Sequence, residues 1–393
     1  MRVLISGGGI AGLTLAYWLH QYGISSVVLE RAADLRQDGY ALDFFGTGYE
    51  VAERMGLLDR LFSEQIAFDG IEYVNAQGKR IAKLDAALLR KITEGKYLAL
   101  MRWSLEEVLY EALEGNVEVR FGRWLVDASP GEQDVSVTFH DGPSESFDLL
   151  IGADGVHSAT RQLLFGPDEQ FSRDLGYTIA CYPLADRYGI GSTWKMYVEP
   201  GRLAAIYCTR QAGELLTFFM YRSTSSKPPP RSMRLAHLRE VFAGMGWITE
   251  QLLTDAPASV PVFMDALTQI QMPTWHRGRV ALIGDACGCP TPLSGQGASL
   301  ALAEAYLLAE ALHEAATYQE AFQRYEKQMQ PLVLAQQKQA RGFATFFLPG
   351  TPLGLFVQQI LVKVVFREAF RSLLRREFSG PSLSMLHPSQ DIP

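Results

Sequence analysis

An apolar run at residues 3–5 predicts a short buried strand at the amino terminus. Three consecutive glycines, residues 7–9, follow this run, and the apolar positions beyond them recur at helical spacing through Leu19. The sequence SSVVLER then predicts a second buried strand that ends at Glu30. The chain therefore opens with a strand, a turn, a helix and a strand, which is the unit of parallel α/β sheets.

Two later segments repeat part of this pattern. Residues 149–151 predict a buried strand that ends in Gly152-Ala153-Asp154-Gly155, and a helix is expected from Ser158 to Leu164. Residues 280–283 predict another strand, followed by Asp285, a proline- and glycine-rich loop and a long Ala/Leu-rich helix that reaches Leu312. Both segments place an acid at the carboxyl end of a strand, where open α/β sheets bind their ligands.

The pattern differs between residues 175 and 221, where four strand-like runs rich in aromatic and β-branched residues follow one another without a helix. This predicts a second, antiparallel sheet, to which a hairpin within residues 71–96 is expected to belong. Residues 31–48 predict a long polar loop. Ser104 is expected to cap a following helix. The chain after residue 312 predicts helices, one broken near Pro331 and a last one over residues 350–378.

These patterns predict a discontinuous organisation. Residues 1–70, 97–174 and 275–335 are expected to form a nucleotide-binding domain, residues 71–96 and 175–274 a second domain, and residues 336–393 a C-terminal helical region. A net charge of -7 argues against non-specific nucleic-acid binding. Four cysteines without zinc or disulfide spacing suit a reducing cytosol, and we interpret Cys287 and Cys289 as small buried residues. No stretch is long and apolar enough to span a bilayer, so we expect a soluble, cytoplasmic monomer or dimer.

The amino-terminal unit carries the G-x-G-x-x-G fingerprint of dinucleotide binding at Gly7, Gly9 and Gly12. Glycine allows the tight turn, the approach of a pyrophosphate and close packing of helix on strand, and Glu30 would accept hydrogen bonds from a ribose. NAD needs one such fingerprint. Three matching segments suit FAD better, because its ribityl chain needs a distant acid and its ring a glycine-rich loop.

The motifs GGGIAG with Glu30, GADGVHSATR and RVALIGDACGCPTPLSGQGASLALAEA resemble those of the single-component flavoprotein monooxygenases of the p-hydroxybenzoate hydroxylase type. The resemblance covers roughly residues 1–335. The CPTPLSGQG loop, the ALDFFG segment and the C-terminal extension look most similar to the tetracycline-inactivating members. The resemblance implies a Rossmann-like FAD-binding domain of the glutathione-reductase type, with an inserted antiparallel-sheet substrate domain and a C-terminal helical extension.

The resemblance also implies a cofactor site, in which FAD and NAD(P)H are the cofactors and no metal is needed. Arg102 would contact the pyrophosphate, Asp285 the ribityl chain, and Asp154 with Arg161 would serve FAD and NAD(P)H. Arg36 and Asp43 match positions that contact FAD and the nicotinamide nucleotide. The residues expected to line the cofactor are Gly7, Gly9, Ile10, Ala11, Gly12, Glu30, Arg31, Arg36, Asp43, Arg102, Asp154, Arg161, Asp285, Pro292, Gly295, Gln296, Gly297 and Ala298.

The implied reaction is a monooxygenation in which NAD(P)H reduces FAD, and a flavin hydroperoxide formed with O₂ transfers one oxygen atom to an aromatic or polycyclic small molecule. Hydroxylation and Baeyer–Villiger insertion both fit. Because the flavin carries the chemistry, no protein group is expected to be catalytic. Seven aromatic residues of the second sheet are expected to line the substrate pocket: Tyr177, Tyr182, Trp194, Tyr197, Tyr207, Phe218 and Phe219. A drug-sequestering flavoprotein without turnover is an alternative, whereas a flavin-dependent halogenase is disfavoured by the lack of a Trp-x-Trp-x-x-Pro segment.

Overall fold

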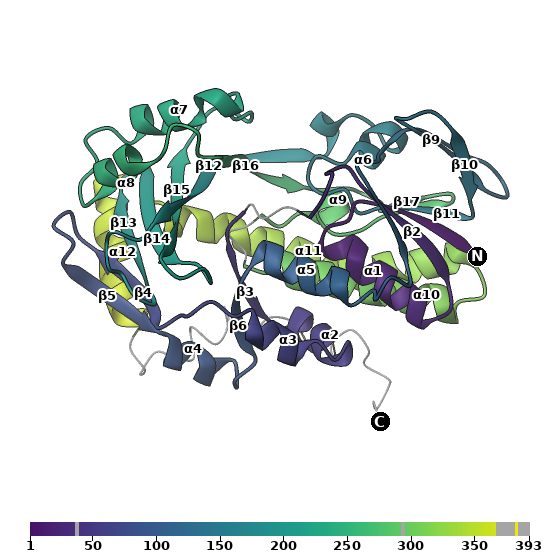
Figure 1. The fold of residues 1–393 in the computed structure, drawn as a ribbon, viewed down its shortest axis with the longest axis horizontal. Coiled ribbons are helices and arrows are strands. Elements are labelled where there is room, and N and C mark those ends of the chain that lie inside the picture. Colours follow the sequence, from purple (N-terminus) through teal and green to yellow (C-terminus); the bar gives the residue numbers. More distant parts are fainter. Residues whose placement is uncertain (36–38, 292–294, 367–381, 384–393) are drawn as a thin grey trace.

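A six-stranded sheet forms one end of the structure, a computed structural model that describes residues 1–35, 39–291, 295–366 and 382–383 (Figure 1). Strand β1 lies near its middle because Val3, Leu4 and Ile5 are fully buried on both faces. All strands are parallel except the edge strand β17. The strand order is β17 (His276–Arg277), β18 (Val280–Leu282), β11 (Leu149–Gly152), β1 (Arg2–Ser6), β2 (Ser25–Glu30) and β7 (Glu118–Phe121).

The two faces of this sheet are covered differently. Val3 and Ile5 pack into a core formed with the helices α1 (Ile10–Gln21), α5 (Arg102–Glu111) and α10 (Gly297–Glu314), and α1 packs directly on α10. Leu4 points the other way, toward a three-stranded antiparallel sheet of β8 (Leu125–Pro130), β9 (Val135–Phe139) and β10 (Ser144–Phe147). Because side chains alternate along a strand, one buried strand contributes to both cores. The predicted Rossmann-like fold is confirmed.

A seven-stranded sheet forms the other end of the molecule (Figure 1). It is antiparallel as predicted, except that β4 pairs in parallel with β13. The helices α7 (Arg234–Val241) and α8 (Thr249–Asp255) cover one face, where they share a core with Tyr182 and Phe219. The strand order is β16 (Phe263–Ile270), β12 (Ser172–Ala185), β15 (Glu214–Arg222), β14 (Arg202–Cys208), β13 (Thr193–Glu199), β4 (Gly70–Val74) and β5 (Arg80–Asp85).

The expected loop over residues 31–48 is wrong in part. Strand β3 (Ala41–Phe45) pairs antiparallel with β6 (Tyr97–Met101), and Phe44 and Phe45 are buried. The partner strand lies far along the sequence, so local composition gave no sign of the pairing. Ser104 does not cap a helix either, because α5 already begins at Arg102 and Ser104 is buried in its first turn.

Two long helices follow α10. Helix α11 (Tyr318–Phe347) runs through Pro331 without ending, so the predicted break is wrong. Proline removes one backbone donor, but buried residues on both sides of it, such as Met329 and Val333, keep the helix packed on the core. Helix α12 (Pro352–Val365) confirms the start of the last predicted helix, whose remainder to residue 378 lies outside the described residues.

The remaining helices are short. They are α2 (Thr47–Arg54), α3 (Leu58–Ser63), α4 (Ala86–Ile92), α6 (Ala159–Leu164), α9 (Asp285–Gly288) and the 3₁₀ turns at Asp168–Gln170 and Arg231–Met233.

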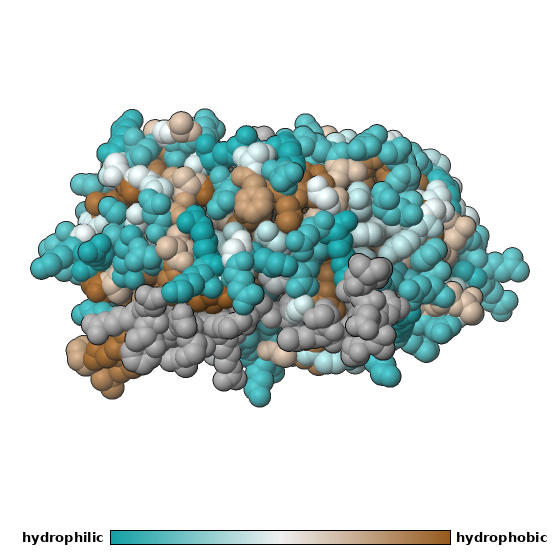
Figure 2. All heavy atoms as spheres, turned by 90° about the horizontal axis from the view of Figure 1, so that it is seen from below, coloured by the Kyte–Doolittle hydropathy of each residue, from teal (hydrophilic) through white to brown (hydrophobic). Residues whose placement is uncertain are grey.

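Helix α12 presents an apolar stripe to solvent. Five of its side chains at helical spacing are exposed: Leu353, Phe356, Val357, Ile360 and Leu361. Figure 2 shows an apolar cluster at the end of the molecule where α12 lies in Figure 1. Within the described ranges, no single helix has the length and apolar character to cross a membrane, although α11 and α12 together, bent by 105° at their junction, meet that test by length and composition.

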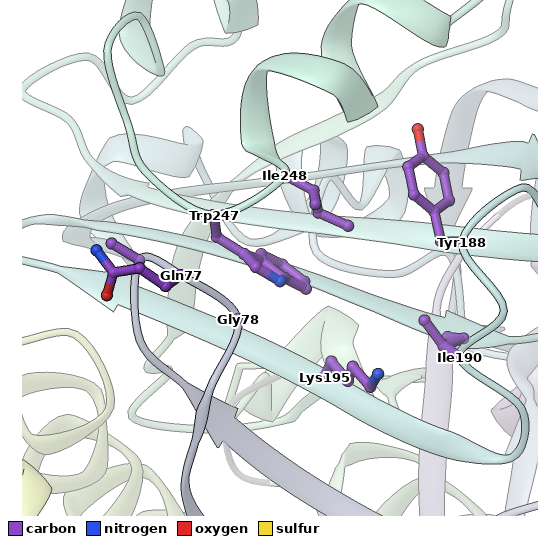
Figure 3. Close-up of a pocket in the computed structure, with 8 residues that line it drawn as sticks. Gln77, Gly78, Tyr188, Ile190, Lys195, Trp247 and Ile248 are labelled. Carbon is purple, nitrogen blue, oxygen red and sulfur yellow. The ribbon is translucent and has the colours of Figure 1, made fainter.

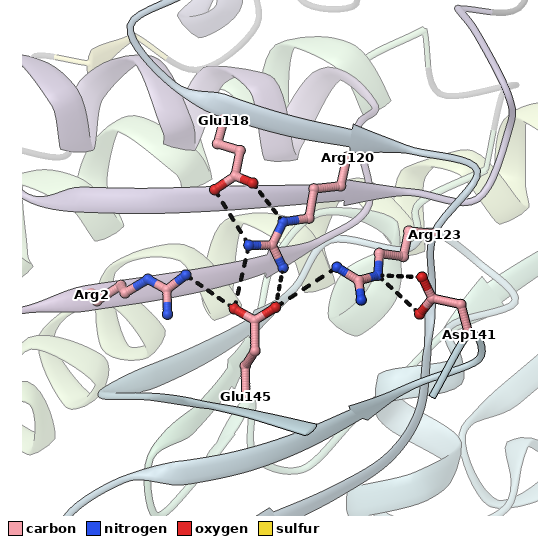
Figure 4. A network of polar contacts seen from close by, with 6 residues as sticks. All are labelled: Arg2, Glu118, Arg120, Arg123, Asp141 and Glu145. Carbon is pink, nitrogen blue, oxygen red and sulfur yellow. Dashed lines mark hydrogen bonds and ion pairs between the residues drawn. The ribbon is translucent and has the colours of Figure 1, made fainter. Parts of the chain in front are cut away.

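An ion-pair network joins the three-stranded sheet to the edge of the six-stranded sheet (Figure 4). Glu145 of β10 lies at its centre, 3.1 Å from Nη2 of Arg2, 2.5 Å from Nη1 of Arg120 and 3.7 Å from Nη1 of Arg123. Arg120 also pairs with Glu118, and Arg123 also pairs with Asp141. Several partly buried charges that share one centre stabilise a fold more than isolated surface pairs do.

Replacing Glu145 with glutamine will therefore destabilise the fold, by about 1–2 kcal/mol at low salt and less at 1 M salt. The hydrogen bond from Arg120 lowers the pKa of Glu145. A carboxylate with a lowered pKa stabilises the fold above its unfolded pKa of about 4.3 and loses this effect as the pH falls through its folded pKa. The difference between wild type and variant in urea unfolding should accordingly vanish in acid. Glu118→Gln is the control, because Glu118 is exposed and, among the described residues, forms its ion pair with Arg120. An equal effect of both variants would contradict the central role of Glu145.

Candidate functional site

The predicted glycine fingerprint connects β1 to α1, and two of its positions accept only glycine. Gly7 adopts φ +117°, and a Cβ there would lie 2.3 Å from the Ala153 carbonyl oxygen. A Cβ on Gly12 would lie 1.9 Å from the carbonyl oxygen of Gly7. The turn therefore packs tightly against both the second segment and its own helix. Gly9 is the N-cap of α1 and supplies no side-chain cap, so the first N–H groups of the helix face outward for an anion.

Glu30 closes this turn from the neighbouring strand. Its carboxylate accepts hydrogen bonds from the N–H of Gly8 at 3.0 Å and of Ala32 at 2.7 Å. The following residue, Arg31, is exposed. Ile10 and Ala11 are buried under the turn, so they shape the site through packing and their backbone. Glu30 thus stands at the end of β2, as the sequence predicted, and its carboxylate holds the fingerprint loop. Its contact with a ribose stays a prediction.

Arg102 and Asp285 come from distant segments to one place. Arg102 begins α5, its guanidinium lies 3.1 Å from Glu106, and a Cβ on Gly9 would lie 3.9 Å from its Nη2 atom. Asp285 begins α9, directly after β18. Burial raises the pKa of Asp285, and the charge of Arg102 opposes this rise. A cation therefore lies between the fingerprint loop and the third segment.

Asp43 marks a second side of the site. Tyr97 of β6 donates a hydrogen bond of 2.6 Å to Asp43 on β3, and burial raises the pKa of Asp43. Its other carboxylate oxygen lies 3.9 Å from the Cβ position of Gly295, which adopts φ +62°. Gln296 occupies the N-cap position of α10 without a side-chain cap, and at Gly297 a Cβ would meet no atom of the described residues within 4 Å. Ala298 lies partly buried in the first turn of α10. The predicted residues Arg36 and Pro292 lie outside the described residues.

Asp154 and Arg161 bind protein groups in this structure. Asp154 accepts hydrogen bonds of 2.9 Å from both the N–H and the hydroxyl of Thr160. Arg161 is fully buried, pairs with Asp168 at 2.6 Å and donates a 2.8 Å hydrogen bond to the carbonyl of Ala286. Arg161 therefore joins the second segment to the third. We propose that it acts on a cofactor indirectly, by holding α9 in place.

The aromatic residues of the seven-stranded sheet divide between its two faces. Of the seven expected to line a substrate pocket, Trp194, Tyr207 and Phe218 pack near Tyr40, on the side of β3. Trp194 stacks on Tyr207 at 4.6 Å, and the Tyr207 hydroxyl accepts a hydrogen bond from the N–H of Ala41. The other four pack elsewhere. Tyr182, Tyr197 and Phe219 pack with α7 and α8, and Tyr177 packs with the C-terminal helices.

A cleft of about 320 Å³ opens on the opposite face of β13 (Figure 3). Lys195 and Trp247 line it, together with Gln77 and Tyr188. Because Lys195 follows Trp194 on the strand, the two side chains point to opposite faces of the sheet. This cleft contains no residue of the three segments described above.

The described residues fit FAD. The amino terminus of α1 has free N–H groups that can bind a phosphate, and the amino terminus of α10 can face an electron-rich ring. The Arg102 cation can pair with the pyrophosphate. The carboxylates of Glu30 and Asp285 can accept hydrogen bonds from hydroxyl groups. Free space at Gly297 allows a flat group to approach the backbone. Tyr97, the partner of Asp43, was missed from the sequence, because it lies in a strand whose pairing is not local.

Comparison with known proteins agrees with this geometry. A family model of the FAD binding domain matches residues 1–185 and 249–339. A flavin-dependent monooxygenase from an unknown prokaryotic organism is 33% identical over 341 residues, which cover 86% of this chain and 87% of the relative. An uncharacterised protein of Mycobacterium tuberculosis (strain ATCC 25618 / H37Rv) is 34% identical over 335 residues, or 84% and 90% of the two chains.

The crystal structure of the tetracycline destructase Tet(55) has the same fold, with a TM-score of 0.80 and 29% identity over 94% of this chain and 96% of that chain. The resemblance predicted from the three motifs is thereby confirmed. Since the family model spans well over half of the chain and a relative above 30% identity spans most of it, the chain belongs to the flavin-dependent monooxygenases of the FAD-binding-domain family.

Proposed function

We propose that this protein binds FAD and uses NAD(P)H and O₂ to add one oxygen atom to an aromatic or polycyclic small molecule, by hydroxylation or by Baeyer–Villiger insertion. One observation carries the proposal. The aromatic face around Trp194 and Tyr207 lies against β3, the strand that brings Asp43 to the amino terminus of α10. An apolar wall beside the cofactor's expected ring position suits a flat, apolar substrate.

The relatives support this choice of substrate. Tet(55) is a tetracycline destructase, and tetracyclines are polycyclic. Aromatic walls bind such molecules by stacking, with a few polar groups that fix orientation. Tyr40 and Phe263, with ring centroids 6.0 Å apart, extend the wall toward Arg102, whose backbone N–H donates to the Tyr40 carbonyl.

The protein's own contribution is binding, orientation and exclusion of water. FAD, when bound, would supply the redox chemistry, that is, hydride acceptance and O₂ activation. Arg102 would neutralise the pyrophosphate, and Asp285 would hold the ribityl hydroxyls. The buried pair of Asp43 and Tyr97 would fix β3 beside the ring. The aromatic wall would keep water from the reacting centre.

The test is a screen of the FAD-loaded protein for NADH and NADPH oxidation with phenols, anthracyclines and tetracyclines. The proposal expects at least one compound to accelerate oxidation and to gain one oxygen atom by mass spectrometry. Tight binding of a compound with neither signal would instead indicate sequestration without turnover. A protein that remains colourless after incubation with FAD would refute both readings.

Trp194→Leu will raise the KM for the active compound about tenfold, because losing an aromatic stacking surface costs roughly 1–1.5 kcal/mol. Its FAD content should be unchanged, since Trp194 lies outside the three cofactor segments. Trp247→Leu is the matched control, on the opposite face of the same sheet. Steady-state kinetics of both variants test the assignment, which fails if Trp247→Leu has the larger effect.

A further inference from the structure

Glu304 is a carboxylic acid in a long helix made mostly of alanine and leucine. It lies on α10 with its side chain 1% exposed. One of its oxygens, Oε2, accepts hydrogen bonds from the N–H of Gly284 at 2.6 Å and from the hydroxyl of Tyr325 at 2.8 Å. The Cys287 thiol lies 3.7 Å from the same oxygen. An acid among the buried residues of an Ala/Leu-rich helix was a signal in the sequence, and it was missed.

The peptide that Glu304 holds is the turn before Asp285. Gly284 adopts φ +62° and joins β18 to α9, whose first residue is Asp285. A Cβ on Gly284 would lie 3.1 Å from the Cβ of Ala11, so the turn is wedged between α1 and α10. Without an acceptor at Glu304, the Gly284 N–H would be buried and unsatisfied. The orientation of this peptide sets where the Asp285 side chain points.

The surroundings of Glu304 contain no cation that bonds to it within the part of the chain described. The groups that face it are the Gly284 amide, the Tyr325 hydroxyl, the Cys287 thiol and, further off, the Asp285 carboxyl. Burial raises the pKa of Glu304 to about 7, and the charge of Asp285 adds to this rise. A leucine at this position would avoid the cost of burying a carboxylate. A leucine would, however, leave the buried Gly284 N–H without its acceptor, so the acid is explained by the turn that it holds.

We propose that Glu304 is a positioning residue for Asp285: by holding the Gly284 peptide it sets the affinity of the protein for FAD and makes that affinity depend on pH near neutrality. The proposal rests on the proposed role of Asp285 in binding FAD. A hydrogen bond to a carboxylate is stronger than one to a neutral carboxyl, so the turn is held more firmly when Glu304 is ionised. FAD should therefore bind more tightly at pH 8 than at pH 6.

Titration of the apo-protein with FAD, followed by quenching of flavin fluorescence at pH 6 and pH 8, tests this. Glu304→Ala is expected to weaken binding about tenfold at both pH values, since it leaves a buried donor unsatisfied. Glu304→Gln keeps an acceptor for the Gly284 N–H, so it should bind FAD as tightly as the wild type does at pH 6. It should not show the higher FAD affinity that the wild type has at pH 8. Glu310→Gln is the matched control, a second buried acid of α10 that bonds to Tyr306 and not to the turn.

A second readout needs no FAD. A carboxyl whose folded pKa is raised stabilises the fold below its unfolded pKa and loses this effect as the pH rises through the folded pKa. The melting temperature of apo Glu304→Gln should therefore rise relative to the wild type between pH 5 and pH 8. If Glu304→Ala is not recovered folded, Tyr325→Phe replaces it and should shift the pH dependence of FAD binding to higher pH, because it removes a donor to the carboxylate.

Three results would overturn the proposal: Glu304→Ala binding FAD within twofold of the wild type, Glu304→Gln keeping the wild-type pH profile, or a melting difference that does not grow with pH. Failure of the proposed function is distinguishable. In that case the wild-type protein binds no FAD at either pH, and Glu304 then has no role in FAD affinity. The melting experiment still measures the effect of the buried Glu304 carboxyl on the stability of the apo-protein.

Discussion

A Gly12→Ala variant will bind FAD on the order of 100-fold more weakly than the wild type, because about 3 kcal/mol of overpacking must be relieved where the cofactor binds. The added Cβ would lie 1.9 Å from the Gly7 carbonyl oxygen and 3.2 Å from Ile5. The first contact is with backbone, so no side chain can rotate away. Relief requires α1 to move off β1, which displaces the N–H groups at the start of the helix. Fluorescence titration with FAD measures the loss.

Gly342→Ala is the control for this prediction. Gly342 also lies inside a helix, α11, but a Cβ there would meet no atom within 4 Å. Alanine is the better helix former, so this variant should gain about 0.5–1 kcal/mol in urea unfolding and keep its affinity for FAD. Equal FAD affinity of the two variants would show that the fingerprint turn does not bind the cofactor.

Asp285→Ala is expected to lower FAD affinity about 10- to 100-fold, since hydrogen bonds to a charged group contribute roughly 1.5–3 kcal/mol. The fold should remain intact, because the carboxylate is costly to bury and its nearest cation, Arg102, already pairs with Glu106. FAD content after gel filtration and the melting temperature of the apo-protein measure the two effects. Full flavin content in this variant would refute the role of Asp285.

The pH dependence of the same variant gives an independent check. Burial raises the pKa of Asp285, so this group stabilises the fold below its unfolded pKa of about 3.9, and the effect is lost as the pH rises through the folded pKa. Apo Asp285→Ala should therefore gain in melting temperature, relative to the wild type, from pH 4 to pH 8. Asp59→Ala, at an exposed acid in the first turn of α3, should show no such trend.

The sequence predicted the parts of this fold that depend on local pattern. The strands β1, β2, β11 and β18 are short apolar runs with glycine or an acid at their ends, and both their type and their position were predictable. The cofactor loop at Gly7–Gly12 was equally clear, because its spacing is set by the contact between a helix and a strand. The domain boundaries remain a prediction.

Other parts depend on partners that are distant in sequence. Strand β3 exists because Ala41–Phe45 pairs with Tyr97–Met101, and without that partner the polar, glycine-containing sequence around it looks like a loop. Helix α11 continues through Pro331 because its flanking residues are buried against the core. The face to which each aromatic residue of the second sheet points, such as Trp194 or Tyr197, depends on register, which pairing fixes.

The separation of α1 and α10 along the sequence also affects how the chain folds during its synthesis. Helix α1 packs on α10, yet the whole seven-stranded sheet is encoded between them. At typical rates of synthesis α10 leaves the ribosome roughly 15–60 s after α1. During that time the side of α1 that packs on α10 in the finished protein lacks its partner. The nascent chain is thus exposed to aggregation until α10 has been made, when about four-fifths of the 393 residues have been translated. Chaperones that shield amino-terminal segments during synthesis should therefore raise its yield more than those that act after the chain leaves the ribosome.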